Sequence, residues 1–319
     1  MIIYRFKEND KYIYKDYRNN IIKDKKTLEK INNIVVPPAY ENVKIYLDNC
    51  SKILYEGYDS KGRLQQIYTA LHRKKADKQK FCRLIEYGKI LPKLQSDINN
   101  YIKSTRITKN KIISTIIKII MTCGFRIGNI KYKILYGSTG ISNICKKNIK
   151  FNSKNTTIKF IGKKGVLNEC NITDASIIKS LHDLLKNKKD NDYIFTYMVN
   201  NNQELIKPID INKWLESYGN FVTKDIRTWN VNIKFIEDMK NITKDIHKLT
   251  ITNRKKNVVS IIKDIAISIN NTPAICKKSY IHPSLIDTYI NNPRTYKRHF
   301  IGESSSRIIF LNFLKCYCK

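Results

Sequence analysis

Short runs of β-branched and aromatic residues, interrupted by polar turns, fill the first part of the chain. The clearest runs are residues 12–14, 44–47 and 52–55. Such runs are typical of short β-strands. The two prolines within residues 36–40 predict a rigid loop. Up to about residue 70, the pattern therefore predicts a β-rich segment.

Helical periodicity replaces this pattern further along. Six isoleucines from Ile112 to Ile120 predict a buried helix, and apolar residues from Val258 to Ile269 recur at helical spacing. Thr272 fits the N-cap of the next helix, with Pro273 at its first position. The polar, basic residues 72–80 are either a hinge or clasp, or the solvated face of a helix.

A β-hairpin is predicted between the helical segments. Residues 156–161 and 166–170 flank Gly162-Lys163-Lys164-Gly165, whose two glycines can take positive φ. The chain as a whole is expected to be an α+β protein. We place a small β-rich domain at residues 1–74 and a larger, mainly helical domain at residues 75–319.

Charge restricts the class of partner. Sixty Lys and Arg residues against 27 Asp and Glu give a formal net charge of +33. The mutual repulsion of these positive charges favours a polyanionic partner. Nucleic acid is the first candidate, and an anionic membrane surface is the second. The apolar stretch 112–121 is about half of what a membrane span needs. The first seven residues contain no apolar block of signal-peptide length.

The eight cysteines are scattered and form no Cys-x-x-Cys pair. This spacing favours reduced intracellular thiols over a disulfide framework or a zinc site.

Tyr280 lies among basic residues, beside Lys277 and Lys278. Tyrosine can form covalent intermediates. Attack on a phosphodiester needs bidentate donors for the charge on the phosphate oxygens and an acid for the leaving oxygen. Arg126 and Arg227 are candidate donors, and Lys163 is a candidate acid.

Each of these basic residues also has an ordinary structural explanation. Arg126 could form a buried ion pair or extend to the surface. Asp225 could hold Arg227 so that its guanidinium points towards a phosphate, or the two residues could form an ordinary surface ion pair. Lys163 could be a solvated hairpin-tip lysine.

Four ordered motifs resemble the active-site motifs of type IB DNA topoisomerases, above all the small poxvirus enzyme and its relatives, including entomopoxvirus-like ones. They are Gly124-Phe125-Arg126-Ile127-Gly128, Lys159-Phe160-Ile161-Gly162-Lys163, Lys224-Asp225-Ile226-Arg227-Thr228, and the run from Asn271-Thr272-Pro273 to Lys277-Lys278-Ser279-Tyr280. A fifth, Gly57-Tyr58-Asp59-Ser60-Lys61-Gly62-Arg63, and the chain length also fit.

The resemblance implies a β-rich DNA-binding domain and a helical catalytic domain of the tyrosine recombinase and type IB topoisomerase type, closing as a clamp around duplex DNA. Tyr280 would form a 3′-phosphotyrosyl link and expel a 5′-hydroxyl. Arg126 and Arg227 would hold the phosphate, and Lys163 would protonate the leaving oxygen. Religation reverses the reaction, so no ATP, metal or other cofactor is expected. A monomer without membrane attachment is expected too.

Two departures from the family pattern affect the site. Asn271 stands where the family usually has histidine, so the donor remains but cannot be cationic. In the DNA-reading segment, one tyrosine of the family is replaced by Gln66. The residues expected to contact DNA are Lys61, Arg63, Gln65, Gln66, Tyr68, Lys131 and Tyr132.

Two alternative functions remain open. A tyrosine site-specific recombinase shares the catalytic residues, but usually carries a helical arm- or core-binding domain. A noncatalytic basic DNA-binding protein would explain the charge but not the ordered motifs. The resemblance places the protein in virions and at cytoplasmic replication sites if it is poxvirus-like, and otherwise inside cells with DNA.

Overall fold

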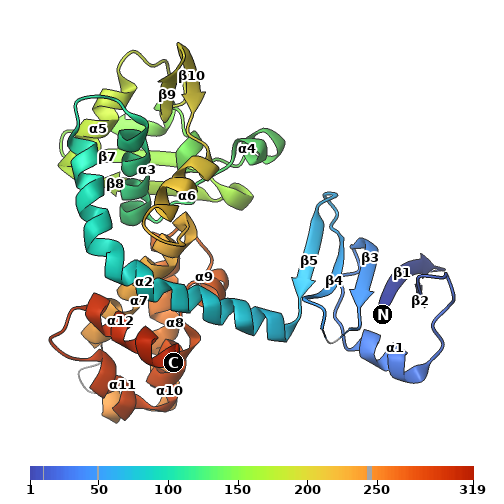
Figure 1. Ribbon diagram of the computed structural model, residues 1–319. Coiled ribbons are helices and arrows are strands. Elements are labelled where there is room, and N and C mark those ends of the chain that lie inside the picture. Colours follow the sequence, from blue (N-terminus) through green and yellow to red (C-terminus); the bar gives the residue numbers. More distant parts are fainter. Residues whose placement is uncertain (10, 49, 243–245) are drawn as a thin grey trace. The chain divides into compact units, whose positions relative to one another are not determined.

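The computed structural model describes residues 1–9, 11–48, 50–242 and 246–319 (Figure 1). The chain forms two compact units, Met1–Gln79 and Lys80–Lys319, and their boundary falls within helix α2 (Ala70–Lys103). The smaller unit is mainly a β-sheet and the larger unit is mainly helical, which confirms the expected α+β class.

The smaller unit contains a five-stranded antiparallel sheet with the strand order β2-β1-β3-β4-β5. Its strands are β1 (Ile2–Glu8), β2 (Lys11–Lys15), β3 (Glu41–Tyr46), β4 (Ile53–Tyr58) and β5 (Leu64–Tyr68). The predicted run 12–14 lies within β2, and the runs 44–47 and 52–55 overlap with β3 and β4. Helix α1 (Lys25–Asn32) contributes Ile31 to a core that includes Ile3, Val43, Ile45 and Tyr55.

Helices dominate the larger unit, with a small sheet on one side of it (Figure 1). After α2, its helices are α3 (Lys109–Cys123), α4 (Ile130–Tyr136), α5 (Ala175–Leu185), α6 (Pro208–Glu216), α7 (Thr223–Ile242), α8 (Ile251–Ser268), α9 (Pro273–Ser279), α10 (Pro283–Asn291), α11 (Pro293–Phe300) and α12 (Ser306–Tyr317). Strands β6 (Ile149–Phe151), β7 (Thr156–Ile161) and β8 (Leu167–Ile172) form a three-stranded sheet, and β9 (Thr196–Val199) pairs with β10 (Asn202–Leu205).

The isoleucine-rich helix α3 lies in the core of the larger unit, as its sequence predicts. All six isoleucines are buried, and α3 packs on α5, α7 and β8. Thr108 caps its first turn, and Gly124 ends it in the left-handed conformation, with φ of 62°. Glycine accommodates this conformation without the penalty that a side chain brings. The helix therefore ends three residues before Arg126.

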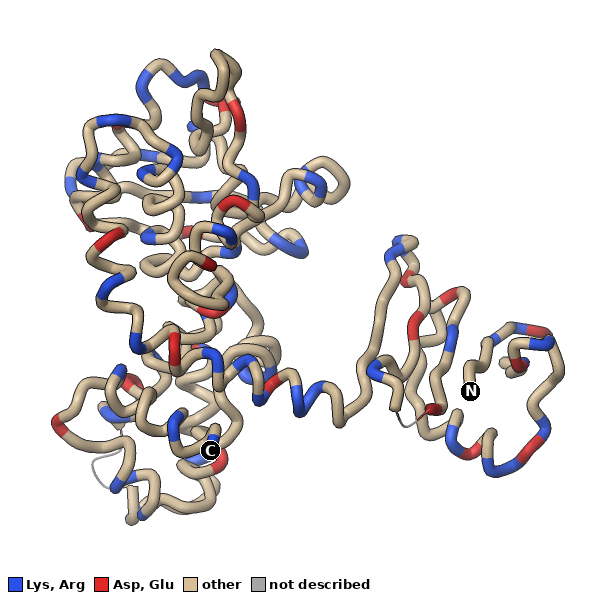
Figure 2. Tube along the Cα trace, in the orientation of Figure 1, with Lys and Arg blue, Asp and Glu red and all other residues tan. Residues whose placement is uncertain are grey.

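Basic residues recur along both units, as Figure 2 shows. The basic run 72–80 lies within α2, and residues 73–79 are all exposed. The run therefore forms a solvated helix face, and it also contains the boundary between the two units. In the part of the chain that the structure describes, no helix is long and apolar enough to cross a membrane.

The expectation that all cysteines are reduced is wrong for four of them. Cys82 is bonded to Cys318, and Cys123 is bonded to Cys170. The two pairs are 236 and 47 residues apart in the sequence. Cysteine spacing along the chain reveals little about such pairs, because only tertiary packing brings their Cα atoms within bonding range.

Candidate active site

Tyr280 directly follows the short helix α9. Thr272 caps this helix by accepting a hydrogen bond from the amide of Ile275 at 3.3 Å, and Pro273 occupies the first position, as predicted. The amide of Tyr280 donates to the carbonyl of Cys276 at 3.1 Å. Only 7% of Tyr280 is exposed. The helix therefore fixes the backbone of Tyr280 and places its side chain in a largely buried position.

Arg227 lies beside Tyr280. Its guanidinium carbon is 5.3 Å from the centre of the Tyr280 ring, and the residue is 3% exposed. Nη2 donates to the carbonyl of Ile269 at 3.2 Å, whereas Nε and Nη1 are buried and have no hydrogen-bond partner within the described residues. Burial lowers the pKa of Arg227, and Tyr280 opposes that shift. Arginine nevertheless stays charged, so two buried cationic donors are available to an anion.

Asp225 does not hold Arg227, contrary to the expectation from the sequence. Its carboxylate instead accepts two hydrogen bonds from Arg83 on α2, at 2.7 and 3.0 Å, and a third from the amide of Val222. Residues 225 and 227 are two apart on α7, and such residues do not face each other on a helix. Asp225 thus joins α7 to α2.

Arg126 lies half-buried in the loop after α3. Its Nη1 donates to the carbonyl of Asn270 at 3.4 Å, and its own carbonyl accepts from the amide of Ile141 at 2.9 Å. The backbone of this loop passes very close to itself at Gly128 and Gly140. A Cβ added to Gly140 would lie 2.3 Å from the Cα of Gly128. This close backbone approach explains why both positions are glycine.

Asn271 completes the group of donors. Its Nδ2 is buried and has no partner in the described ranges, while its Oδ1 accepts from the amide of Thr272 at 3.1 Å. The carbonyls of the two preceding residues, Ile269 and Asn270, hold Arg227 and Arg126. Three consecutive residues after α8 therefore organise both guanidinium groups and the asparagine donor.

Lys163 lies at the exposed tip of the predicted hairpin. Lys164 and Gly165 take positive φ, at 63° and 73°, whereas Gly162 does not. Gly162 is instead needed for space, because a Cβ there would lie 2.4 Å from the side chain of Asn168. The segment Ile269–Asn271 and the contact between Arg227 and Tyr280 link four of the five predicted catalytic residues, and within the described residues Lys163 makes none of these contacts.

The hairpin is nevertheless attached to the Arg126 segment. The rings of Phe125 and Phe160 are 4.9 Å apart, and the Cys123–Cys170 disulfide joins the end of α3 to β8. These contacts restrict how far the Lys163 hairpin can move from Arg126.

Sequence reasoning missed Asn232. This residue is completely buried on α7. Its Nδ2 donates to the carbonyl of Tyr280 and its Oδ1 accepts from the amide of His282, both at 2.8 Å. A lone asparagine in a chain rich in asparagine gives no sequence signal. Its place between the apolar residues Val231 and Ile233 is the one feature that could have marked it.

The proposed DNA-reading residues of the smaller unit lie on the β4–β5 hairpin. The carboxylate of Asp59 accepts hydrogen bonds from the amides of Lys61 and Arg63 and from the side chains of Arg63 and Gln65. The Arg63 side chain is the main reason why the pKa of Asp59 falls to about 2. These hydrogen bonds to Asp59 hold the turn between β4 and β5, and Lys61 lies exposed on that turn.

Successive residues of β5 point to opposite faces of the sheet. Gln66 and Tyr68 are exposed on one face, whereas Gln65 and Ile67 are half-buried on the other. The side chain of Gln65 therefore lies on the opposite face of the sheet from those of Gln66 and Tyr68, although the three residues are close in sequence.

Lys131 and Tyr132 are exposed on α4 of the larger unit. Asn129 caps this helix by accepting from the amide of Lys131 at 2.9 Å. Every described side chain of α4 is at least partly exposed. The helix therefore presents a mixed basic and aromatic surface close in sequence to Arg126.

Two family models match the chain. The family model for the catalytic core of eukaryotic DNA topoisomerase I matches residues 69–302, and the model for the N-terminal domain of bacterial DNA topoisomerase IB matches residues 11–59.

Viral relatives match across most of the chain. DNA topoisomerase 1B of Acanthamoeba polyphaga mimivirus is 33% identical, covering 99% of this chain and 95% of that protein. DNA topoisomerase 1 of Rabbit fibroma virus is 23% identical, with coverage of 82% and 81%. DNA topoisomerase 1B of Vaccinia virus (strain Copenhagen) is 22% identical, with coverage of 88% for both chains. The chain belongs to the type IB DNA topoisomerases, and it is an isomerase that acts on DNA.

Proposed function

We propose that this protein relaxes supercoiled duplex DNA by cutting and rejoining one strand through Tyr280. The phenolic oxygen attacks a backbone phosphorus, and the bond from that phosphorus to the 5′ oxygen breaks. A 3′-phosphotyrosyl link and a free 5′-hydroxyl result. After strand rotation, the 5′-hydroxyl attacks the same phosphorus and releases Tyr280. The phosphodiester energy is conserved in the link, so the cycle runs without ATP.

One observation carries this proposal: buried donors without a partner in the described residues lie on Arg227, beside the tyrosine, and on Asn271, just before the helix that leads to it. Nε and Nη1 of Arg227 and Nδ2 of Asn271 are all buried and unpaired within the described residues. Buried polar groups normally find hydrogen-bond partners, and each exception calls for an explanation. A phosphate oxygen beside Tyr280 supplies that partner, and preorganised donors stabilise the charge that develops in the transition state.

Arg126 and Lys163 complete the proposed chemistry. Arg126 donates to a further phosphate oxygen. Lys163 gives its proton to the departing 5′ oxygen and recovers it when religation begins. Its place on a short exposed turn suits an acid that must approach the phosphate once DNA is bound.

We infer that both units contact the duplex. In the smaller unit, Lys61, Arg63, Gln66 and Tyr68 face the DNA, and Gln65 supports the turn through Asp59. In the larger unit, Lys131 and Tyr132 on α4 reach the duplex near the cut. With a net charge of +33, binding weakens steeply as salt rises, because neutralised phosphates release counterions. A monomer carries all the proposed catalytic residues.

The names of the viral relatives suggest where the protein works. Because the matched relatives are viral proteins, we propose that this protein works in virions and at cytoplasmic replication sites.

Relaxation of negatively supercoiled plasmid, in EDTA and without ATP, tests the proposal. The parent protein should relax the plasmid and form a covalent adduct at the 3′ end of the cut. Tyr280→Phe should lose both activities and still bind DNA. An adduct without turnover would instead favour a site-specific recombinase. DNA binding without adduct or relaxation would favour a noncatalytic DNA-binding protein, and the mechanism would be wrong.

A further inference from the structure

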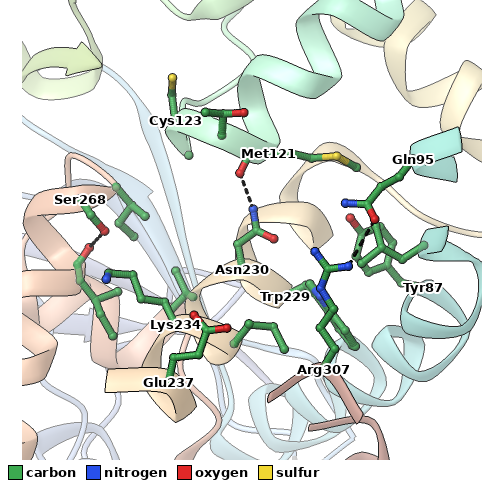
Figure 3. Close-up of a pocket in the computed structure, with 17 residues that line it drawn as sticks. Tyr87, Gln95, Met121, Cys123, Trp229, Asn230, Lys234, Glu237, Ser268 and Arg307 are labelled. Carbon is green, nitrogen blue, oxygen red and sulfur yellow. Dashed lines mark hydrogen bonds between the residues drawn. The ribbon is translucent and has the colours of Figure 1, made fainter. Parts of the chain in front are cut away.

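A half-open cavity of about 400 Å³ lies in the larger unit, next to the segments that hold the two arginines. Its walls come from α2, α3, α7, α8 and α12, as Figure 3 shows. This volume is in the range that small organic ligands occupy in proteins. None of the proposed catalytic or DNA-contacting residues lines the cavity, so the cleavage mechanism does not account for it.

The hydroxyl of Tyr87 marks the cavity as a binding site. Tyr87 is completely buried, lines the cavity, and its hydroxyl has no hydrogen-bond partner within the described part of the chain. Edge contacts with Phe221 and Trp229 fix its ring. Burial raises the pKa of Tyr87, so the hydroxyl keeps its proton and remains a donor. A buried, unpaired donor of this kind calls for a partner.

A cation, Arg307, also lines the cavity. Figure 3 shows Tyr87, Gln95 and Arg307 on the same side of the cavity, with Nη1 of Arg307 donating to Oε1 of Gln95 at 3.3 Å. Arginine has five N–H donors, so most of its guanidinium remains available to a ligand. A neutral hydroxyl and a guanidinium together suit a carboxylate. Trp229 and Met121 supply apolar walls.

We propose that this cavity binds a small aryl carboxylate. The carboxylate lies between Tyr87 and Arg307, and the flat ring packs against Trp229.

Such a ligand contacts chain segments that position both of the proposed catalytic arginines. Gly124, two residues before Arg126, lines the cavity, and so does Ile269, whose carbonyl holds Arg227. Asn230, one helical turn after Arg227, donates to the carbonyl of Met121 at 2.8 Å and so joins α7 to α3. The ligand therefore changes the rate of DNA cleavage without competing for DNA.

Calorimetric titration of the full chain with 2-naphthoate tests the site, with the neutral 2-naphthamide as the charge control. Naphthoate should bind, and the amide should bind at least about tenfold more weakly, because a hydrogen-bonded charge is lost. Tyr87→Phe and Arg307→Gln should each weaken naphthoate binding to a similar degree. Arg298→Gln, which removes one exposed charge on α11, should leave it unchanged.

Two further measurements separate the ligand from folding and from DNA. Tyr87→Phe should melt at the parent temperature or higher, since it removes an unpaired buried hydroxyl. Naphthoate should alter single-turnover cleavage by the parent but not by Arg307→Gln. The proposal is overturned if the parent does not bind naphthoate, if Tyr87→Phe and Arg307→Gln bind it as the parent does, or if duplex DNA displaces it. The binding results stand even if Tyr280 is not the nucleophile.

Discussion

Asn232 holds the backbone of Tyr280. Its Nδ2 donates to the Tyr280 carbonyl at 2.8 Å, and its Oδ1 accepts from the amide of His282 at the same distance. Asn232 and Arg227 lie on the same helix, α7. One rigid element therefore fixes the positions of the proposed nucleophile, Tyr280, and of the guanidinium beside it. Small displacements of a nucleophile reduce reaction rates strongly, so this bond is expected to matter for cleavage.

Replacement of Asn232 should slow covalent chemistry more than DNA binding. Asn232→Ala removes both hydrogen bonds, and the loss of a side-chain partner costs a buried backbone group about 1–3 kcal/mol. We expect single-turnover cleavage to fall about tenfold to a hundredfold, with the Kd for DNA within about twofold of the parent. Asn232→Asp keeps the acceptor for His282 and tests which bond matters. If Asn232→Ala cleaves at the parent rate, Asn232 does not position Tyr280.

Arg227→Ala should reduce cleavage about 10²–10³-fold, the usual effect of removing one transition-state donor. Arg227→Lys should recover little of this loss, because lysine keeps the charge but cannot form two parallel hydrogen bonds. Rapid-quench measurement of adduct formation gives the rates. Arg294→Ala, an exposed change on α11, is the matched control. Equal loss in both variants would mean that net charge, not geometry, is responsible.

Asn271→His should make cleavage depend on pH near neutrality. A histidine there donates best as a cation and loses its charge as pH rises through its pKa, ordinarily about 6.5. Cleavage by Asn271→His should therefore be fastest at low pH and decline above that pKa, relative to a parent profile recorded in parallel. Asn271→Ala should be slower than the parent, by about tenfold. Parent-like cleavage by Asn271→Ala would exclude this residue from the site.

Arg83→Ala should destabilise the larger unit. The change leaves the carboxylate of Asp225, which is buried, without its cation. Removing one partner of a fully buried ion pair costs about 3–5 kcal/mol. Arg83 is about one-third exposed, so we expect about 2 kcal/mol, or about 4–8 °C in Tm. Scanning calorimetry against Arg294→Ala measures the difference. An unchanged Tm would show that the pair contributes nothing to stability.

Thiol counting tests the two disulfides. Denatured, unreduced protein should contain four reactive thiols, from Cys50, Cys145, Cys276 and Cys316. Reduction should expose all eight and lower the free energy of unfolding, by about 2–4 kcal/mol for each disulfide. The double change Cys123→Ser, Cys170→Ser should also loosen the Lys163 hairpin and slow cleavage. Eight thiols before reduction would mean that these bonds are absent from the protein.

Local patterns accounted for much of the fold. The buried helix α3, the β7–β8 hairpin and the cap of α9 at Thr272 and Pro273 were all predictable, because each depends on residues close in sequence. Strands β1 and β5 and helix α1 were not recognised. Their residues give weaker periodic signals. In addition, β1 pairs with the distant strand β3, and β5 is an edge strand that, within the described residues, pairs only with β4.

The sequence by itself determined which chemical groups the site uses. The order of Arg126, Lys163, Arg227 and Tyr280 indicated the family, and composition indicated a polyanionic partner. Only the tertiary structure decided how these groups are held. In the structure, the carboxylate of Asp225 accepts hydrogen bonds from Arg83, and Asn232 donates a hydrogen bond to the carbonyl of Tyr280. Four cysteines form two disulfides. These contacts join residues tens to hundreds of positions apart, and packing of the whole core, rather than any local preference, sets which of them form.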